Sequence, residues 1–108
     1  MKIPESIRIG GMEYQVRYTP QLNDGVNLCY GKIDFEKSCI QLNGSMELSH
    51  EKLCVVLLHE ILHGIRNYAG IEIAEEEAVV EMFAKGLYQV LQDNGQRLFD
   101  LREGGGEK

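Results

Sequence analysis

The segment that decides the fold is SHEKLCVVLLHEILHGIRNYAG, residues 49–70. Its apolar residues recur at the three- and four-residue spacing of an amphipathic helix. Ser49 precedes this pattern, and serine is a preferred helix N-cap; Gly70 follows it, and glycine commonly ends helices. The segment therefore predicts one helix over residues 50–69.

The sequence His59-Glu60-Ile61-Leu62-His63, an HExxH pattern, lies inside this predicted helix. At 3.6 residues per turn, His59 and His63 stack on one face about 6 Å apart, so both imidazoles can bind one zinc ion. Glu60 lies about 100° around the helix from His59, which places its carboxylate beside the metal to take a proton from water. The pattern therefore predicts a zinc metallopeptidase with His59 and His63 as ligands and Glu60 as catalytic base.

A second helix is predicted over residues 75–93, with apolar side chains on one face and Asn94-Gly95 as its end. It can supply the third protein ligand that catalytic zinc requires. Three glutamates, at positions 75, 76 and 77, follow His63 by 12 to 14 residues, which leaves room for a turn and an antiparallel helix. Helical phase favours Glu76, which lies nearest the centre of the apolar stripe, but Glu75, Glu77, Glu81 and a ligand other than glutamate stay open.

Residues 38–91 resemble the gluzincin arrangement, in which HExxH is followed by a helix with a ligand glutamate, and are most similar to ImmA/IrrE-type metallopeptidases of phages and mobile elements. In that family the third zinc ligand stands six residues before a phenylalanine, which here implies Glu77, counted from Phe83. The resemblance also implies that Glu81 supports a zinc-bound histidine, although the family has Asp or Asn there. It further implies a Zn²⁺ cofactor, a peptide or protein substrate, and phage or prophage origin.

The N-terminal half predicts short strands over residues 6–9, 12–18, 29–35 and 38–42, with a turn at Gly10-Gly11. Alternation places Ile33, Phe35, Ile40 and Leu42 inward. We therefore expect an α+β fold, a small antiparallel sheet followed by two long helices, with residues 1–95 as one minimal zincin-like domain and 96–108 as a flexible tail. The resemblance implies that the strand at 38–42 is a sheet edge able to pair with an extended substrate.

Composition excludes several classes of protein. A formal net charge of −6 makes nucleic-acid binding unexpected, because that function needs a basic surface. The longest apolar run, residues 53–58, is too short to span a membrane, and the N-terminus shows no export signal, so we expect a cytoplasmic protein. The three cysteines show no CxxC spacing and predict reduced, mostly buried thiols. A protein partner remains possible.

Two alternatives to the enzyme stay open at this stage. One is a non-catalytic interaction module in which zinc joins two helices and contributes folding energy without turnover. The other is a metal-free helical adaptor whose acidic face docks a basic partner. Sequence spacing also leaves the oxyanion-stabilising residue unassigned among Tyr30, Tyr68, Tyr88, His50 and the arginines, and zinc undistinguished from other divalent ions.

Overall fold

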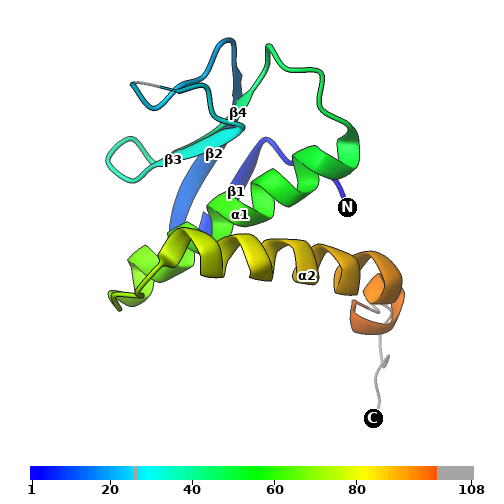
Figure 1. Cartoon of the computed structure of the whole chain (residues 1–108). Coiled ribbons are helices and arrows are strands. Elements are labelled where there is room, and N and C mark those ends of the chain that lie inside the picture. Colours follow the sequence, from blue (N-terminus) through cyan, green and yellow to red (C-terminus); the bar gives the residue numbers. More distant parts are fainter. Residues whose placement is uncertain (26, 100–108) are drawn as a thin grey trace.

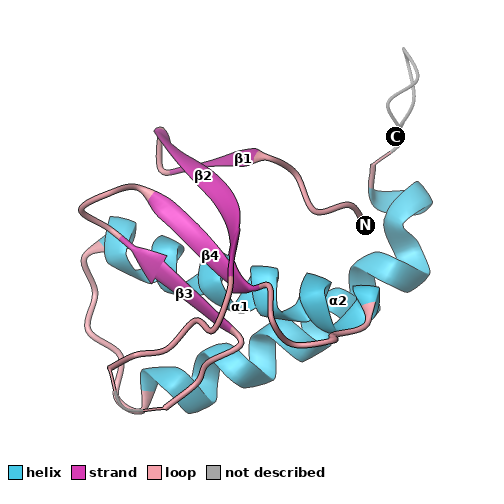
Figure 2. Ribbon diagram, turned by 90° about the horizontal axis from the view of Figure 1, so that it is seen from above, coloured by secondary structure: helices cyan, strands magenta, loops and turns pink. Residues whose placement is uncertain are grey.

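The computed structural model describes residues 1–25 and 27–99 (Figure 1). The α+β class is confirmed, because a four-stranded sheet is followed by two helices (Figure 2). The elements in chain order are β1 (Ser6–Ile9), β2 (Met12–Thr19), β3 (Gly31–Asp34), β4 (Cys39–Asn43), α1 (His50–Ala69) and α2 (Glu76–Leu98).

The sheet is mixed rather than purely antiparallel, with strand order β1-β2-β4-β3. The β1–β2 and β3–β4 pairs are antiparallel, whereas β2 and β4 run parallel with Val16 opposite Ile40. The expectation of an antiparallel sheet is therefore wrong for this central pairing. The reason is that the chain crosses from β2 to the outer edge, forms β3 there, and returns as β4 between the two, which sets β4 in the direction of β2.

This topology also corrects the implied edge strand. β4 is paired on both sides, with β2 and with β3, so the segment at 38–42 is not an edge. The edge strand next to β4 is β3, and it packs against α1. A free row of backbone hydrogen-bonding groups is thus offered by β3, one strand further out than expected.

The core lies between the sheet and α1. Gly64 brings this helix close to the strands, because a Cβ atom there would lie 2.9 Å from Ile9 Cδ1 and 3.2 Å from Ile33 Cδ1. The inward positions of Ile40 and Leu42 are confirmed, and Ile33 is partly buried against them, but Phe35 is exposed because β3 ends one residue before it. The buried residues of the core are Ile9, Tyr14, Ile40, Leu42, Val56 and Leu57.

Helix α1 has the predicted bounds and the predicted caps. The Ser49 hydroxyl accepts a hydrogen bond from the Lys52 N–H at 3.1 Å. Gly70 adopts a left-handed conformation, with φ of 72°, and its N–H donates to the Arg66 carbonyl. A residue with a side chain would be strained at that φ, which explains why glycine ends this helix.

Helix α2 continues beyond its predicted end. Gly95 was expected to terminate it, but the helix runs to Leu98, where the Phe99 N–H donates to the Gly95 carbonyl. Gly95 is not in a left-handed conformation, and glycine inside a helix costs only about 1 kcal/mol, so the other residues of the turn can carry the helix through it. Residues 96–98 are therefore helical, and the rest of the predicted tail, 100–108, lies outside the described residues.

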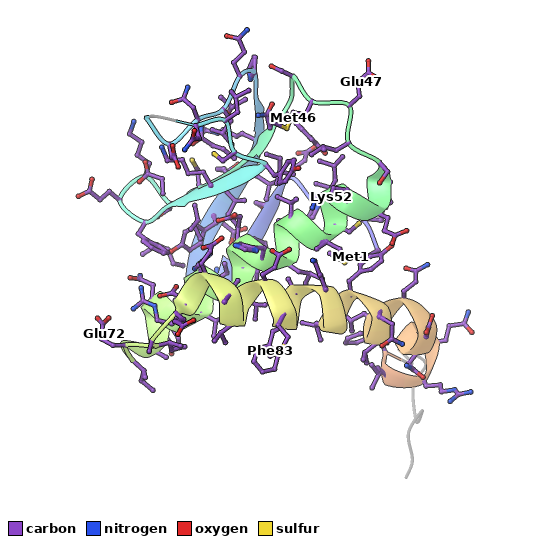
Figure 3. The ribbon with its side chains drawn as sticks, viewed as in Figure 1. Met1, Met46, Glu47, Lys52, Glu72 and Phe83 are labelled. Atoms are coloured by element: carbon purple, nitrogen blue, oxygen red, sulfur yellow. The ribbon has the colours of Figure 1, made fainter. Side chains whose placement is uncertain are left out.

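Helix α2 packs against α1 and buries only a narrow stripe, Val80 and Ala84. Phe83, Leu87 and Val90 are apolar residues of this helix, yet they are 55%, 38% and 41% exposed. Phe83 projects away from α1 and the sheet (Figure 3). The apolar face of α2 is wider than the surface that α1 covers, so part of this face is exposed.

Within residues 1–25 and 27–99, no helix is both long and apolar enough to cross a membrane.

Candidate metal centre

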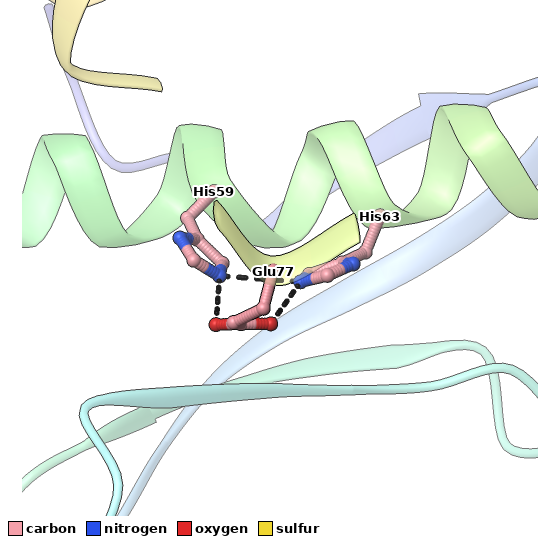
Figure 4. Close-up of side chains that lie close together, drawn as sticks. All are labelled: His59, His63 and Glu77. Carbon is pink, nitrogen blue, oxygen red and sulfur yellow. Dashed lines mark hydrogen bonds and ion pairs between the residues drawn. The ribbon is translucent and has the colours of Figure 1, made fainter. Parts of the chain in front are cut away.

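His59 and His63 lie on one side of α1 and point toward Glu77 in the first turn of α2 (Figure 4). The two imidazole centres are 4.9 Å apart, as the four-residue spacing predicts. His59 Nε2 lies 2.8 Å from Glu77 Oε2, His63 Nε2 lies 3.0 Å from Glu77 Oε1, and the two Nε2 atoms are 3.2 Å apart. Three side chains from two helices thus converge on one point.

The opposite ring nitrogens are already engaged. His59 Nδ1 lies 2.9 Å from Glu81 Oε1, and His63 Nδ1 lies 2.6 Å from Glu76 Oε2. An ionised carboxylate can only accept, so each Nδ1 must carry the proton. In a neutral imidazole the other nitrogen then presents a lone pair. Both Nε2 atoms therefore face the centre as acceptors.

With both imidazoles neutral, this arrangement brings three acceptors together. Two Nε2 lone pairs and a carboxylate at 2.8–3.2 Å repel one another unless a cation lies among them. Zinc binds nitrogen and oxygen at about 2.0–2.2 Å, and tetrahedral ligands at that radius lie about 3.3–3.5 Å apart. His59 meets Glu77 Oε2 and His63 meets Oε1, and one ligand atom from each of the three residues lies within 4.8 Å of the other two, so His59, His63 and Glu77 could hold a metal ion.

The two outer carboxylates are themselves held by cations. Glu76 Oε1 lies 3.0 Å from Arg66 Nε, an ion pair whose N–H is not aligned as a hydrogen bond, and Glu81 Oε2 lies 3.2 Å from Lys85 Nζ. The hydrogen bond from His63, with help from Arg66, lowers the pKa of Glu76. Burial alone would raise the pKa of Glu81, but Lys85 and His59 together outweigh it and lower that pKa. Both groups therefore stay ionised and keep accepting the Nδ1 protons.

Glu60 stands apart from these pairs. Only 6% of it is exposed, and within the described part of the chain no group donates a hydrogen bond to its carboxylate. Burial, with some repulsion from Glu77, raises its pKa, although the two histidines oppose the rise. Glu60 lines a cavity of about 230 Å³ together with His59 and Glu77. His59, His63 and Glu77 are called the metal group below. A buried, unpartnered carboxyl group with a raised pKa beside this group is suited to accept and return a proton.

Gly31, the first residue of β3, makes room for Glu60. A Cβ atom at this position would lie 2.6 Å from Val56 Cγ1 and 3.3 Å from Glu60 Oε2. Val56 is buried and β-branched, so it cannot move aside easily. The absence of a side chain therefore sets how closely β3 approaches the base.

We expect Gly31→Ala to lower the free energy of unfolding by about 1–3 kcal/mol, the usual cost of overpacking. Gly86→Ala is the matched control, because a Cβ at this position in α2 would meet nothing within 4 Å. It should instead raise stability by about 0.5–1 kcal/mol through helix propensity. Urea unfolding of both variants measures the difference, and equal effects would contradict the close approach of β3 to α1.

The structure sorts the three candidate glutamates. Glu77 joins the two Nε2 atoms, whereas Glu76 contacts Nδ1 on the other edge of the His63 ring. Glu75 is the exposed N-cap of α2, with φ of 54°, and is outside the group. The group includes Glu77, as the resemblance implied, and not Glu76, which helical phase alone favoured as third ligand, because phase cannot tell which edge of a ring a carboxylate will reach.

Several residues of the cavity had not been singled out from the sequence. Lys52 and Gly31 both line it. Tyr30, which was already named as a candidate oxyanion donor, lines it too. Tyr68 is 69% exposed, and His50 contacts the Met1 carbonyl at 2.7 Å. The spacing of Lys52, seven residues before His59 on the same helix face, is the signal that could have found it.

Arg66, one of the arginines considered as oxyanion donors, has a side chain that is only 20% exposed and pairs with Glu76. Comparisons of the chain with models of protein families, with curated proteins and with solved structures found no match.

Proposed function

We propose that this protein is a zinc-dependent metallopeptidase that hydrolyses peptide bonds, with His59, His63 and Glu77 as metal ligands and Glu60 as general base. The observation that carries the proposal is the convergence of His59, His63 and Glu77 beside Glu60, a buried carboxyl group that accepts no hydrogen bond within the described residues. A purely structural zinc site would use a fourth protein ligand and would have no use for Glu60. The HExxH pattern and its likeness to gluzincins support the same reading.

The roles of the side chains follow from their contacts. When bound, zinc would supply Lewis acidity, polarising a peptide carbonyl and making water acidic enough to lose a proton near neutral pH. Glu60 would accept that proton and pass it to the leaving amine, and its raised pKa suits both transfers. Glu76 and Glu81 would hold the imidazoles with Nε2 unprotonated toward the metal.

The proposal is tested by metal content and hydrolysis measured on the same preparation. Purified protein supplied with zinc should retain about one ion per chain. It should then cleave a mixture of unstructured peptides, with products identified by mass spectrometry. Chelation should abolish cleavage and added zinc should restore it. Stoichiometric zinc without cleavage would leave a metal-binding protein, and failure to retain any divalent ion would remove the proposal altogether.

Glu76 should matter through His63 rather than through the metal. We expect Glu76→Gln to weaken zinc binding by about 10- to 100-fold, the usual effect of removing a carboxylate that orients a ligand histidine. Glu75→Gln is the matched control, since this exposed neighbour contacts neither histidine in the metal group. Competition with a fluorescent zinc chelator measures both affinities, and equal affinities would contradict an orienting role for Glu76.

A non-catalytic interaction module is a second candidate because of one observation. Leu62 and α2 form a hollow apolar surface in which Phe83, Leu87 and Val90 are exposed. Surfaces of this kind often bind another protein. If the Glu60→Gln variant retains zinc and loses no function, this candidate is favoured, because only catalysis requires the carboxylate.

A further inference from the structure

The cavity beside the metal group has one cationic end. Among the described residues that line it, Lys52 is the only cation, facing an acidic wall formed by Glu60, Glu77 and Glu81. Lys52 lies in the first turn of α1 (Figure 3), and its N–H is fixed by the Ser49 cap. Its backbone position is therefore well defined.

Within the described part of the chain, the Lys52 ammonium has no carboxylate ion-pair partner. Its Nζ lies 4.5 Å from the centre of the Tyr30 ring, and the residue is half-buried. A cation over an aromatic face is held in place but keeps its hydrogen-bond donors for another acceptor. The chain has 17 acidic residues and a net charge of −6, yet none of the described carboxylates pairs with this ammonium. The ammonium is therefore available to bind an acidic group of a ligand.

The distance from Lys52 to the metal group matches a short stretch of extended peptide. Seven residues of helix separate Lys52 from His59 on one face, a rise of about 10 Å. β3 follows α1 in the same direction, since Gly31 lies at Val56 and Glu60 while Ile33 lies at Gly64. An extended chain along the free edge of β3 advances about 3.3 Å per residue, so about three residues cover this distance.

The size of the cavity agrees with that placement. Its volume of about 230 Å³ is below the roughly 300–1,000 Å³ of pockets that enclose a whole small ligand. It can therefore hold part of an extended chain, with the rest lying along β3. A carboxylate is the group that would satisfy a free ammonium at this end.

We propose that Lys52, held over Tyr30, forms a carboxylate-binding subsite that selects peptides carrying an acidic side chain or a free C-terminal carboxylate about three residues from the bond at the metal group. The inference rests on the proposed peptidase function and adds a substrate class to it. The two sources of the carboxylate share one chemistry, and the experiment separates them.

The probe is a random heptapeptide library, prepared once with both ends blocked and once with a free C-terminus. Zinc-loaded Glu60→Gln protein is immobilised, and the retained peptides are sequenced. We expect acidic residues at one position, or the free C-terminus, to be enriched about ten-fold or more, as for a hydrogen bond to a charged group. Enrichment in the blocked library identifies a side chain, and enrichment confined to the free library identifies the C-terminal carboxylate.

Second substitutions in the same background assign the effect to Lys52. Lys52→Gln should remove the enrichment and Lys52→Arg should keep it, both at unchanged zinc content. Lys37→Gln, an exposed charge in the turn after β3, should also keep it. No enrichment with Lys52 present, no retained peptide, or enrichment that survives Lys52→Gln would each overturn the subsite.

The same peptides offered to the zinc-loaded wild type test the peptidase itself. Retention with acid enrichment but no cleavage would reject hydrolysis and keep the subsite. Cleavage without acid preference would reject the subsite alone.

Discussion

Glu60→Gln should leave zinc bound and lower peptide hydrolysis by about 10²- to 10⁴-fold, the contribution of a positioned general base. The substitution keeps the shape of the side chain and removes its ability to accept a proton. Glu60 points into the cavity and is not among the three groups that converge on the metal. Hydrolysis rates and zinc content measured on one preparation check the prediction. An equal loss of zinc and activity would instead make Glu60 a ligand.

The same variant should not be less stable than the wild type, which separates lost chemistry from lost folding. Burial raises the folded pKa of Glu60 above its ordinary value of 4.5. A group with a raised folded pKa contributes its full stability below the unfolded pKa and loses it as pH rises through the folded pKa. Metal-free Glu60→Gln lacks this loss, so it should be the more stable protein at pH 7 and lose that advantage below about pH 4.5. Denaturant unfolding at both pH values gives the comparison.

His63→Ala should nearly abolish metal binding. A structural zinc site contributes about 10–16 kcal/mol from four ligands, so one ligand accounts for about 100- to 1,000-fold in affinity. His63 Nε2 lies 3.0 Å from one Glu77 oxygen and 3.2 Å from His59 Nε2, so its loss opens the group on one side. Isothermal titration with zinc measures the change. Glu77→Ala should have a similar effect.

His50→Ala supplies the matched control, because His50 is the one histidine outside the HExxH pattern. It should bind zinc as the wild type does. Thermal unfolding gives an independent readout, since zinc at 100 times its dissociation constant should stabilise the wild type by about 2.7 kcal/mol. That stabilisation should be absent in His63→Ala. Zinc binding that survives in His63→Ala would move the metal to other residues.

The bounds of α1 and the pairing of its two histidines could be predicted because they depend on local spacing. A four-residue interval places His59 and His63 together in any α-helix, and Ser49 and Gly70 end it by backbone preferences that act within one turn. The second helix was harder, because its end at Leu98 depends on whether Gly95 adopts a left-handed conformation, which the residue type permits but does not require.

The choice between Glu76 and Glu77 needed the packing of α2 on α1. Adjacent residues on a helix differ by about 100°, so a modest rotation of one helix decides which carboxylate meets Nε2 and which meets Nδ1. Arg66 takes part in that decision by holding Glu76 at one side of the His63 ring. Helical periodicity does not carry this information, and only the resemblance to gluzincins, through the spacing of Glu77 before Phe83, implied Glu77.

The sequence by itself determined the α+β class, the bounds of α1, and the placement of His59 and His63 on one face of it, because periodicity and capping are properties of neighbouring residues. The tertiary structure alone decided that β4 is central and β3 is the edge, that Glu76 reaches Nδ1 of His63 while Glu77 reaches Nε2, and that Lys52 and Tyr30 line the cavity beside them. These features join segments far apart in the chain. Their geometry follows from strand order and helix packing, which are settled by the burial of the whole core rather than by any one stretch of residues.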